Sequence, residues 1–213
     1  MDIVRSIQQF ASQPIPHHLM TSLLKECRQP NDRIHNLIKK GILQQVRRGS
    51  YVAGPRITSP KPEPFLLANH ILGPSYVSLE SALSYYGLIP ERVYEITSMT
   101  IKSKCKFSTS LGLFSYTRIA LPYYSYGIRS MEVDKQHRFL IASPEKALFD
   151  KIITTPGVEF RSKTSVLSYI ENDLRIDTDE LKNLDLSIMK SWAPTLPKKK
   201  GSFFKLIETI QEY

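Results

Sequence analysis

The sequence predicts an α+β protein in two parts, a small basic domain (residues 1–56) and a larger mixed α/β domain with an antiparallel-rich sheet (residues 65–213). Three observations lead to this prediction. Apolar residues in the first fifty positions recur with a helical period and then with the period of a hairpin. Residues 54–64 hold four of the 14 prolines, so we expect a proline-rich linker at residues 57–64. Beyond it, strand-like and helix-like segments are mixed.

Three helices are expected in the small domain. The first spans Ile3–Phe10 and the second Leu19–Leu24, each with apolar residues at helical spacing. Pro30 and Asn31 open the third helix, with Asn31 as its N-cap. Gly41 fits the residue that follows the end of this helix, where a left-handed backbone is common. The buried side of the third helix consists of Ile34, Leu37 and Ile38.

A hairpin follows the third helix. Val46 and Tyr51 are expected to lie opposite each other on one face, and Gly49 supplies the positive φ of a tight turn. This arrangement carries Arg47 and Arg48 to the turn. Three helices and a hairpin, with a polar outer side on the third helix, describe a winged helix-turn-helix. In that fold the third helix enters the major groove of DNA and the hairpin reaches phosphates or the minor groove.

The charge distribution agrees with a polyanionic partner. The chain has a net charge of +9, and residues 1–60 hold nine Lys and Arg against three Asp and Glu. An asparagine can bind adenine through two hydrogen bonds, and cations hold phosphates. The residues expected to contact double-stranded promoter DNA are Arg33, His35, Asn36, Lys39, Lys40, Gln44, Arg47, Arg48 and Ser50. The alternative is a winged helix used for protein contacts, with cations that are merely solvated.

The larger domain is expected to contain strands and helices in the following order. Ser78 caps a helix that ends at Gly87. Four strand candidates follow at residues 93–101, 111–121, 128–133 and 138–142. Ser143 and Pro144 then start a helix, because proline suits the first helical position. Two further helices are expected at residues 164–170 and 203–210.

Three stretches resemble the AbiEi family of antitoxins from type IV toxin–antitoxin and abortive-infection systems. The first is RIHNLIKKGILQQVRRGSYV, which resembles the winged-helix segment of the family. YVSLESALSYYGLIPE (residues 76–91) and IASPEKALFDKI (residues 141–152) resemble recurring segments of its C-terminal domain, in the same order. The stretch after Ile153 carries no segment of the family.

The resemblance implies a protein with two functions. Its first domain would repress transcription of its own operon by binding inverted repeats in the promoter. Its second domain would counter a cognate nucleotidyltransferase-type toxin, by direct or indirect contact. The resemblance implies neither a cofactor nor catalysis. Two other classes stay open, a stand-alone ligand-sensing regulator and a Mg²⁺-dependent nucleic-acid enzyme. For the enzyme, Asp177 and Asp179 have a suitable spacing, but DTDELKNL is typical of the first turn of a helix.

Two further groups of residues allow two interpretations each. One face of an extended strand would carry Lys102, Lys104 and Lys106. This face is either a basic patch that binds an acidic partner or RNA, or a solvated strand edge that discourages aggregation. The cluster YYSYG (Tyr123, Tyr124 and Tyr126) would form a hairpin or a contact surface, and the hairpin is preferred.

Targeting signals, membrane spans and metal motifs are not expected. No apolar run is long enough to cross a bilayer, so we expect a cytoplasmic protein. Cys27 and Cys105 lack the spacing of a metal or redox motif and are expected to be free thiols. The five histidines form no familiar ligand cluster, so neither a metal nor a cofactor is expected.

Overall fold

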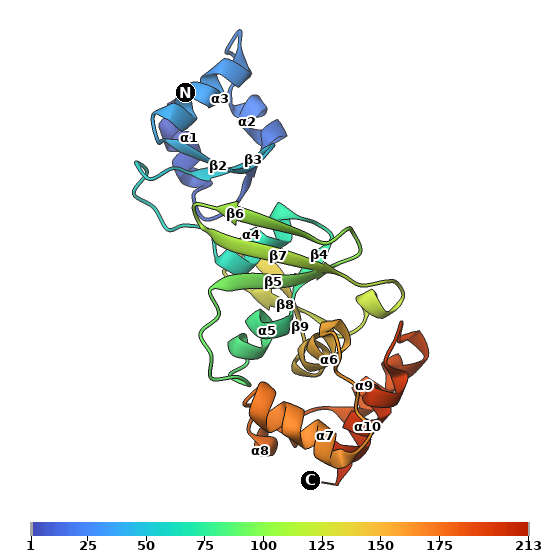
Figure 1. Cartoon of the computed structure of the whole chain (residues 1–213). Helices are drawn as coiled ribbons and strands as arrows, with labels where there is room; N and C mark the ends of the chain where they lie inside the picture. Colours follow the sequence, from blue (N-terminus) through green and yellow to red (C-terminus); the bar gives the residue numbers. More distant parts are fainter. Residues whose placement is uncertain (1, 213) are drawn as a thin grey trace.

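The computed structural model describes residues 2–212 (Figure 1). These residues build two hydrophobic cores, and one hairpin contributes side chains to both of them. We call residues 2–57 the N-terminal unit and residues 64–212 the C-terminal unit. The elements of the N-terminal unit are, in order, α1 (Ile3–Gln9), β1 (Ile15–Pro16), α2 (His17–Leu23), α3 (Pro30–Lys39), β2 (Leu43–Arg47) and β3 (Ser50–Ala53).

The three expected helices and the hairpin are present in the N-terminal unit. Pro30 is the first residue of α3, so Gln29 and not Asn31 holds the N-cap position. Gly41 follows α3 with φ +66°, as expected, and Gly49 turns the hairpin with φ +79°. The two-residue strand β1 was not expected, because it is short and contains a proline. Pairing with β3 on one side only makes this proline tolerable.

The prediction that Val46 and Tyr51 share one face of the hairpin is wrong. Tyr51 pairs with Gln45, and the register then shifts before Arg47, so Val46 occupies a bulge. An extra residue in one strand reverses the face on which the next side chain lies. As a result, Tyr51 is buried in the N-terminal core, whereas Val46 and Val52 are buried in the core of the C-terminal unit.

The C-terminal unit is built on a mixed six-stranded sheet in the order β6-β7-β5-β4-β9-β8. Its strands are β4 (Ser75–Val77), β5 (Glu95–Thr100), β6 (Cys105–Thr109), β7 (Gly112–Arg118), β8 (Ile128–Glu132) and β9 (Arg138–Ala142). The pairs β4–β5, β6–β7 and β8–β9 are antiparallel, and the pairs β5–β7 and β4–β9 are parallel. The expected α+β class with an antiparallel-rich sheet is therefore confirmed.

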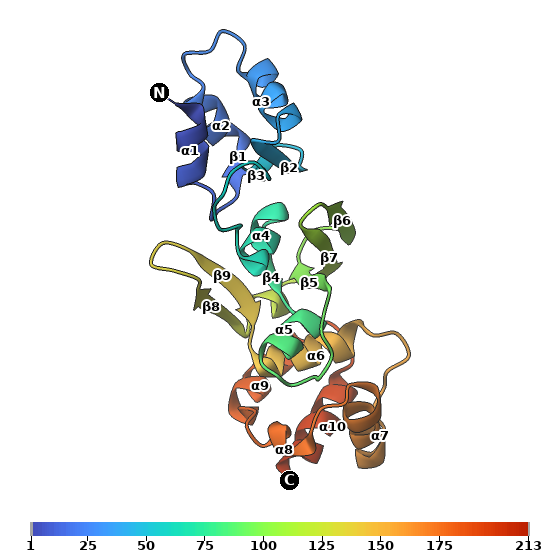
Figure 2. The ribbon, with the colours of Figure 1, turned by 90° about the vertical axis from the view of Figure 1, so that its left-hand side faces the viewer.

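Helices cover both faces of this sheet (Figure 2). α4 (Pro64–Ile71) lies on the side nearest the N-terminal unit, while α5 (Leu79–Tyr85) and α6 (Pro144–Thr154) lie on the other side. The remaining helices gather at the far end of the molecule, beyond α6. They are α7 (Lys163–Ser168), η2 (Tyr169–Asp173), α8 (Thr178–Leu181), α9 (Leu186–Trp192), η3 (Ala193–Thr195) and α10 (Lys200–Gln211). The short helix η1 (Tyr123–Ser125) connects β7 to β8.

The proline-rich segment is attached to the N-terminal unit over its first residues. The Gly54 amide donates to the Ile42 carbonyl at 2.8 Å, and the Arg56 amide donates to the Gly41 carbonyl at 3.0 Å. Ile57 packs against the N-terminal core. α4, which was not expected, starts at Pro64 because the Glu63 carboxylate caps it by accepting from the Leu66 amide. Within residues 2–212, no helix is long and apolar enough to cross a membrane.

Candidate nucleic-acid interface

The outer side of α3 is open to solvent. Ile34 and Leu37 are buried beneath it, and Ile38 is half-buried. The polar side chains that project outward from the helix are Asp32, Arg33, His35, Asn36, Lys39 and Lys40, all of them exposed. α3 therefore presents hydrogen-bonding and cationic groups along its outer side, with one carboxylate, Asp32, in its first turn. Arg33 lies toward a different edge from His35, because it borders a pocket beside Leu23 and Cys27.

A groove of about 520 Å³ runs between α3 and the hairpin. Ile34 and Ile38 contribute its apolar lining. Its polar lining comes from three elements, and consists of His17 on α2, Asn31 and His35 on α3, and Gln45, Arg48 and Tyr51 on the hairpin. None of the described residues that line the groove carries a carboxylate. The groove therefore joins the outer side of α3 and the end of the hairpin into one surface.

His17 is fixed against the hairpin from two directions. Its backbone amide donates to the Gly49 carbonyl at 2.9 Å. Its ring nitrogen Nδ1 lies 3.3 Å from the Tyr51 hydroxyl oxygen. Burial raises the pKa of Tyr51, so this hydroxyl keeps its proton at neutral pH. Sequence analysis missed His17, Asn31, Gln45 and Tyr51, because the fold brings them to α3 from other elements or from its first turn.

Two of the residues expected to contact DNA point elsewhere. The Arg47 guanidinium donates to the Ile71 carbonyl at the end of α4, and the Gln44 side-chain amide donates to the Ser110 hydroxyl in the β6–β7 turn. The Arg47 charge also opposes the rise in the pKa of the Cys105 thiol that burial causes. Both side chains therefore contact the C-terminal unit. Ser50 is half-buried and pairs with β1 and β2, while Arg48 stays exposed in the turn.

A third polar contact between the units lies near the β8–β9 turn. His137 Nε2 lies 3.1 Å from the Gln13 side-chain oxygen, which accepts from it, and His137 Nδ1 lies 2.8 Å from the Asp134 carboxylate. Together with the Arg47 and Gln44 contacts and the burial of Val46 and Val52, it fixes the orientation of the hairpin relative to the sheet.

The expected lysine face on one strand is not present. Strand β6 begins at Cys105, so Lys102 and Lys104 lie in the turn that precedes it and only Lys106 is in the strand. Lys106 on β6 is 2.9 Å from Glu95 on β5, across the intervening strand β7, and this contact lowers the pKa of the Glu95 carboxyl. The strict alternation that we assumed requires an extended backbone, and the turn interrupts it. All three lysines are exposed.

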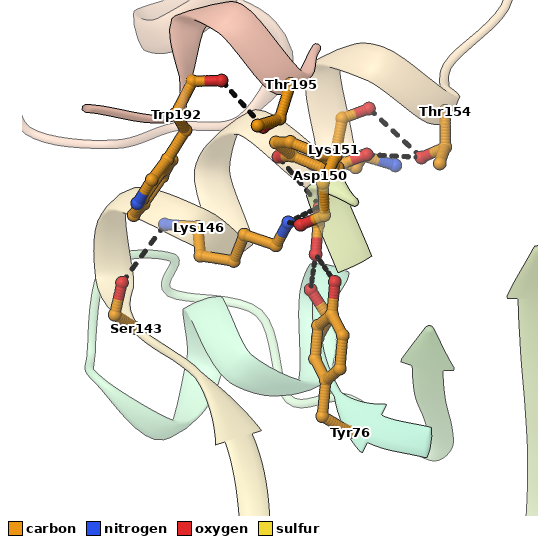
Figure 3. A network of polar contacts seen from close by, with 10 residues as sticks. Tyr76, Ser143, Lys146, Asp150, Lys151, Thr154, Trp192 and Thr195 are labelled. Carbon is orange, nitrogen blue, oxygen red and sulfur yellow. Dashed lines mark hydrogen bonds and ion pairs between the residues drawn. The ribbon is translucent and has the colours of Figure 1, made fainter. Parts of the chain in front are cut away.

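The tyrosine cluster does not form the hairpin that we preferred. Tyr123 and Tyr124 belong to the short helix η1, and Tyr123 is completely buried. Its hydroxyl donates to Asp150 at 3.0 Å. Asp150 also accepts from the Tyr76 hydroxyl at 3.0 Å (Figure 3) and from the Ser78 hydroxyl at 2.7 Å. Ser78 precedes α5 as expected, but its side chain binds Asp150 and does not cap the helix.

Lys146 completes this buried network. Its ammonium lies 3.5 Å from the Asp150 carboxylate (Figure 3). It donates to the Tyr123 carbonyl at 2.9 Å and lies 3.0 Å from the centre of the Tyr123 ring. Burial lowers the pKa of Lys146 to about 8, and Asp150 limits this decrease. Burial and then the Asp150 charge raise the pKa of Tyr76 and Tyr123 well above the ordinary value. Tyr76, Ser78, Tyr123, Lys146 and Asp150 are all completely buried, so the geometry of the network is that of a structural connection between elements.

The two C-terminal stretches that carry the family resemblance lie side by side. β4 in the first pairs with β9 in the second through Val77 and Ile141, and α5 packs against α6. In the second stretch, Ser143 caps α6, Pro144 is its first residue, and Glu145 accepts from the Asp185 amide at 3.0 Å. Ser143 thus stabilises the start of α6, and Glu145 connects α6 to the start of α9.

The aspartates that would indicate a Mg²⁺-dependent enzyme have other partners, and the pocket beside α5 that would indicate a ligand-sensing C-terminal unit is small. Asp177 caps α8 and Asp179 pairs with Lys182, as expected for a helix start. A pocket of about 240 Å³ beside α5 has only exposed or half-buried polar groups at its edge, among them the paired Glu80 and Lys151. Pockets for drug-sized ligands usually have about 300–1,000 Å³. In the part of the chain that the structure describes, no group of three or more His, Cys, Asp or Glu could hold a metal ion.

No protein-family model and no curated protein matches the chain. The resemblance to the AbiEi family therefore stays a prediction that rests on the three stretches quoted above.

Proposed function

We propose that the chain is a DNA-binding transcriptional repressor and that its N-terminal unit acts as a winged helix-turn-helix. One observation carries this proposal. The exposed outer side of α3 and the end of the hairpin form a continuous surface with cationic and amide side chains, joined by a groove without carboxylates. A helix and a hairpin in this relation fit the major groove and the neighbouring backbone of double-stranded DNA.

The residues divide into two roles. Asn36, in the middle of the outer side of α3, reads a base edge, because an asparagine amide can bind adenine through two hydrogen bonds. Lys39, Lys40 and Arg48 hold phosphates, which sets the register and not the sequence. Gln44 and Arg47 support the hairpin from behind through their contacts with the C-terminal unit.

Binding of the full chain to short duplexes from the promoter of its own operon tests this function. Fluorescence anisotropy should show affinity that decreases steeply with salt concentration, because phosphate contacts release counterions. Asn36→Ala should reduce the preference for the promoter over a mixed-sequence duplex, and should leave the salt dependence unchanged. Absence of binding at low salt would contradict the proposal.

We further propose that the C-terminal unit acts as the antitoxin, countering a nucleotidyltransferase-type toxin. This part rests on the family resemblance, and the side-by-side packing of the two resembling stretches supports treating them as one functional piece. Coexpression with the product of an adjacent nucleotidyltransferase gene tests it. Growth should be restored by the full chain, and continued growth arrest would contradict the antitoxin role.

A further inference from the structure

The groove between α3 and the hairpin contains imidazole and guanidinium groups that the recognition of bases by α3 does not require. Two imidazoles face it from different helices, His17 at the start of α2 and His35 on α3, and the Arg48 guanidinium lines it from the hairpin turn. Ile34 and Ile38 line it without adding charge. A concave site with three potential cations and no carboxylate among its described lining residues is suited to a single anion.

The position of the groove identifies the anion. If α3 lies in the major groove and the hairpin reaches toward the minor groove, the sugar–phosphate strand that separates the two grooves passes between them. This argument rests on the proposed function. We infer that the groove seats one phosphodiester of the DNA backbone, and that His17 and His35 bind it as imidazolium cations together with Arg48.

The hydrogen-bond geometry of His17 fits this role. A protonated His17 donates through Nδ1 to the Tyr51 oxygen, which lies 3.3 Å away, and its Nε2–H remains for a phosphate oxygen. Its backbone contact with Gly49 keeps the ring beside the turn that carries Arg48. The phosphate seat is therefore fixed by contacts that exist without DNA.

Charged groups of both signs lie around the imidazoles. On α3, the Asp32 carboxylate lies one turn before His35 and the Lys39 ammonium one turn after it. From the other elements, the Arg48 guanidinium and the neutral Tyr51 hydroxyl face the groove. A bound phosphate adds a negative charge that favours both imidazolium ions, so DNA binding takes up protons. Histidine is the side chain that changes its charge between about pH 5 and 8.

The test measures the affinity of the full chain for a mixed-sequence duplex at about pH 6 and about pH 8, at constant ionic strength. Wild type should bind about tenfold more tightly at the lower pH, because two further charge-assisted contacts form. His17→Gln and His35→Gln should each reduce this ratio, and the double variant should bind equally and weakly at both values. His35→Lys should keep tight binding at the higher pH. His18→Gln is the matched control, since His18 is the exposed neighbour outside the groove.

The outcomes separate the two proposals. Absence of binding by wild type at both pH values overturns the proposed function. Salt-dependent binding with the same affinity at both pH values overturns only the phosphate seat, as does a double variant that keeps the wild-type ratio. The phosphate seat is supported if His18→Gln keeps the wild-type ratio of affinities at the two pH values and the double variant binds equally at both.

Discussion

Lys146 and Asp150 are completely buried one helical turn apart, with the ammonium nitrogen 3.5 Å from a carboxylate oxygen. Three hydroxyl groups donate to the carboxylate, and the ammonium donates to the Tyr123 carbonyl. A buried pair of this kind contributes little net stability over an apolar pair, but the loss of one partner leaves an uncompensated buried charge.

Asp150→Asn should therefore strongly destabilise the fold. We expect a decrease of about 3–5 kcal/mol in the free energy of unfolding, because the Lys146 ammonium loses its counter-charge. Urea denaturation followed by circular dichroism measures it. Asp179→Asn, an exposed aspartate on α8, is the control and should unfold like wild type. Wild-type stability of Asp150→Asn would show that the network contributes nothing to the fold.

The stability of the fold should change with pH in two opposite steps. The folded pKa of Lys146, about 8, is below its ordinary value of 10.5, so the unfolded chain binds more protons in this window and stability rises with pH. Tyr76 and Tyr123 have raised pKa values, so their contribution is complete below about pH 10 and is lost above it. Urea midpoints across this range should rise and then fall. Lys146→Met should abolish the rise, and a monotonic profile for wild type would contradict this assignment.

Arg48 and Arg47 should differ in their effect on DNA binding. Arg48→Ala should weaken binding to every sequence and reduce the slope of log affinity against log salt by about 1, because one phosphate contact is lost. Arg47→Ala should leave that slope unchanged, since its guanidinium binds the Ile71 carbonyl. Anisotropy titrations at several salt concentrations measure both. Equal slopes in the two variants would show that Arg47 leaves Ile71 to contact DNA.

Replacement of the three lysines near β6 should separate stability from partner binding. Changing Lys102, Lys104 and Lys106 to Ser should barely change the melting temperature, because exposed charges contribute little. The pKa of Glu95 should return toward its ordinary value as its contact with Lys106 is lost, which NMR titration can follow. Loss of growth rescue with an unchanged melting temperature would identify the lysines as a partner surface, and full rescue would remove them from it.

Val52→Asp should loosen the attachment between the two units. Val52 is buried in the C-terminal core although it belongs to the N-terminal hairpin, so a carboxylate there would be desolvated without a partner. Limited proteolysis should then cut the segment at residues 58–63 faster than in wild type. Val4→Asp, at an exposed position on α1, should be cut at the wild-type rate. Unchanged cleavage in Val52→Asp would show that the polar contacts alone hold the units together.

Much of the secondary structure could be predicted because the signals are local. Helical spacing predicted α3, proline at the first helical position predicted α6, and Gly49 predicted the hairpin turn. α4 was hidden because its first proline also continues the proline-rich segment. The bulge at Val46 could not be predicted from the alternation of apolar and polar residues, because one additional residue in a strand does not change that pattern in a recognisable way.

The candidate site was only partly predictable, for reasons of long-range packing. The outer side of α3 follows from its apolar stripe, so Asn36 and Lys39 were placed correctly as exposed residues. Both faces of the hairpin pack against other parts of the protein. The spacing of residues in β2 therefore could not predict that the side chains of Gln44 and Arg47 contact the C-terminal unit. His17 reaches the groove from another helix, and Asp150 meets Tyr76 from 74 positions away, distances over which sequence spacing carries no information.

The shared hairpin makes the two cores a single cooperative system. β3 loses part of its burial if either core melts, because Tyr51 belongs to one core and Val52 to the other. Amides in segments that unfold together are protected by the same opening free energy. The amides of β3 should thus show the global opening free energy of the C-terminal sheet, and calorimetry of the full chain should record one heat-absorption peak. In contrast, the N-terminal unit expressed alone would expose an apolar strip on the hairpin and melt at a lower temperature.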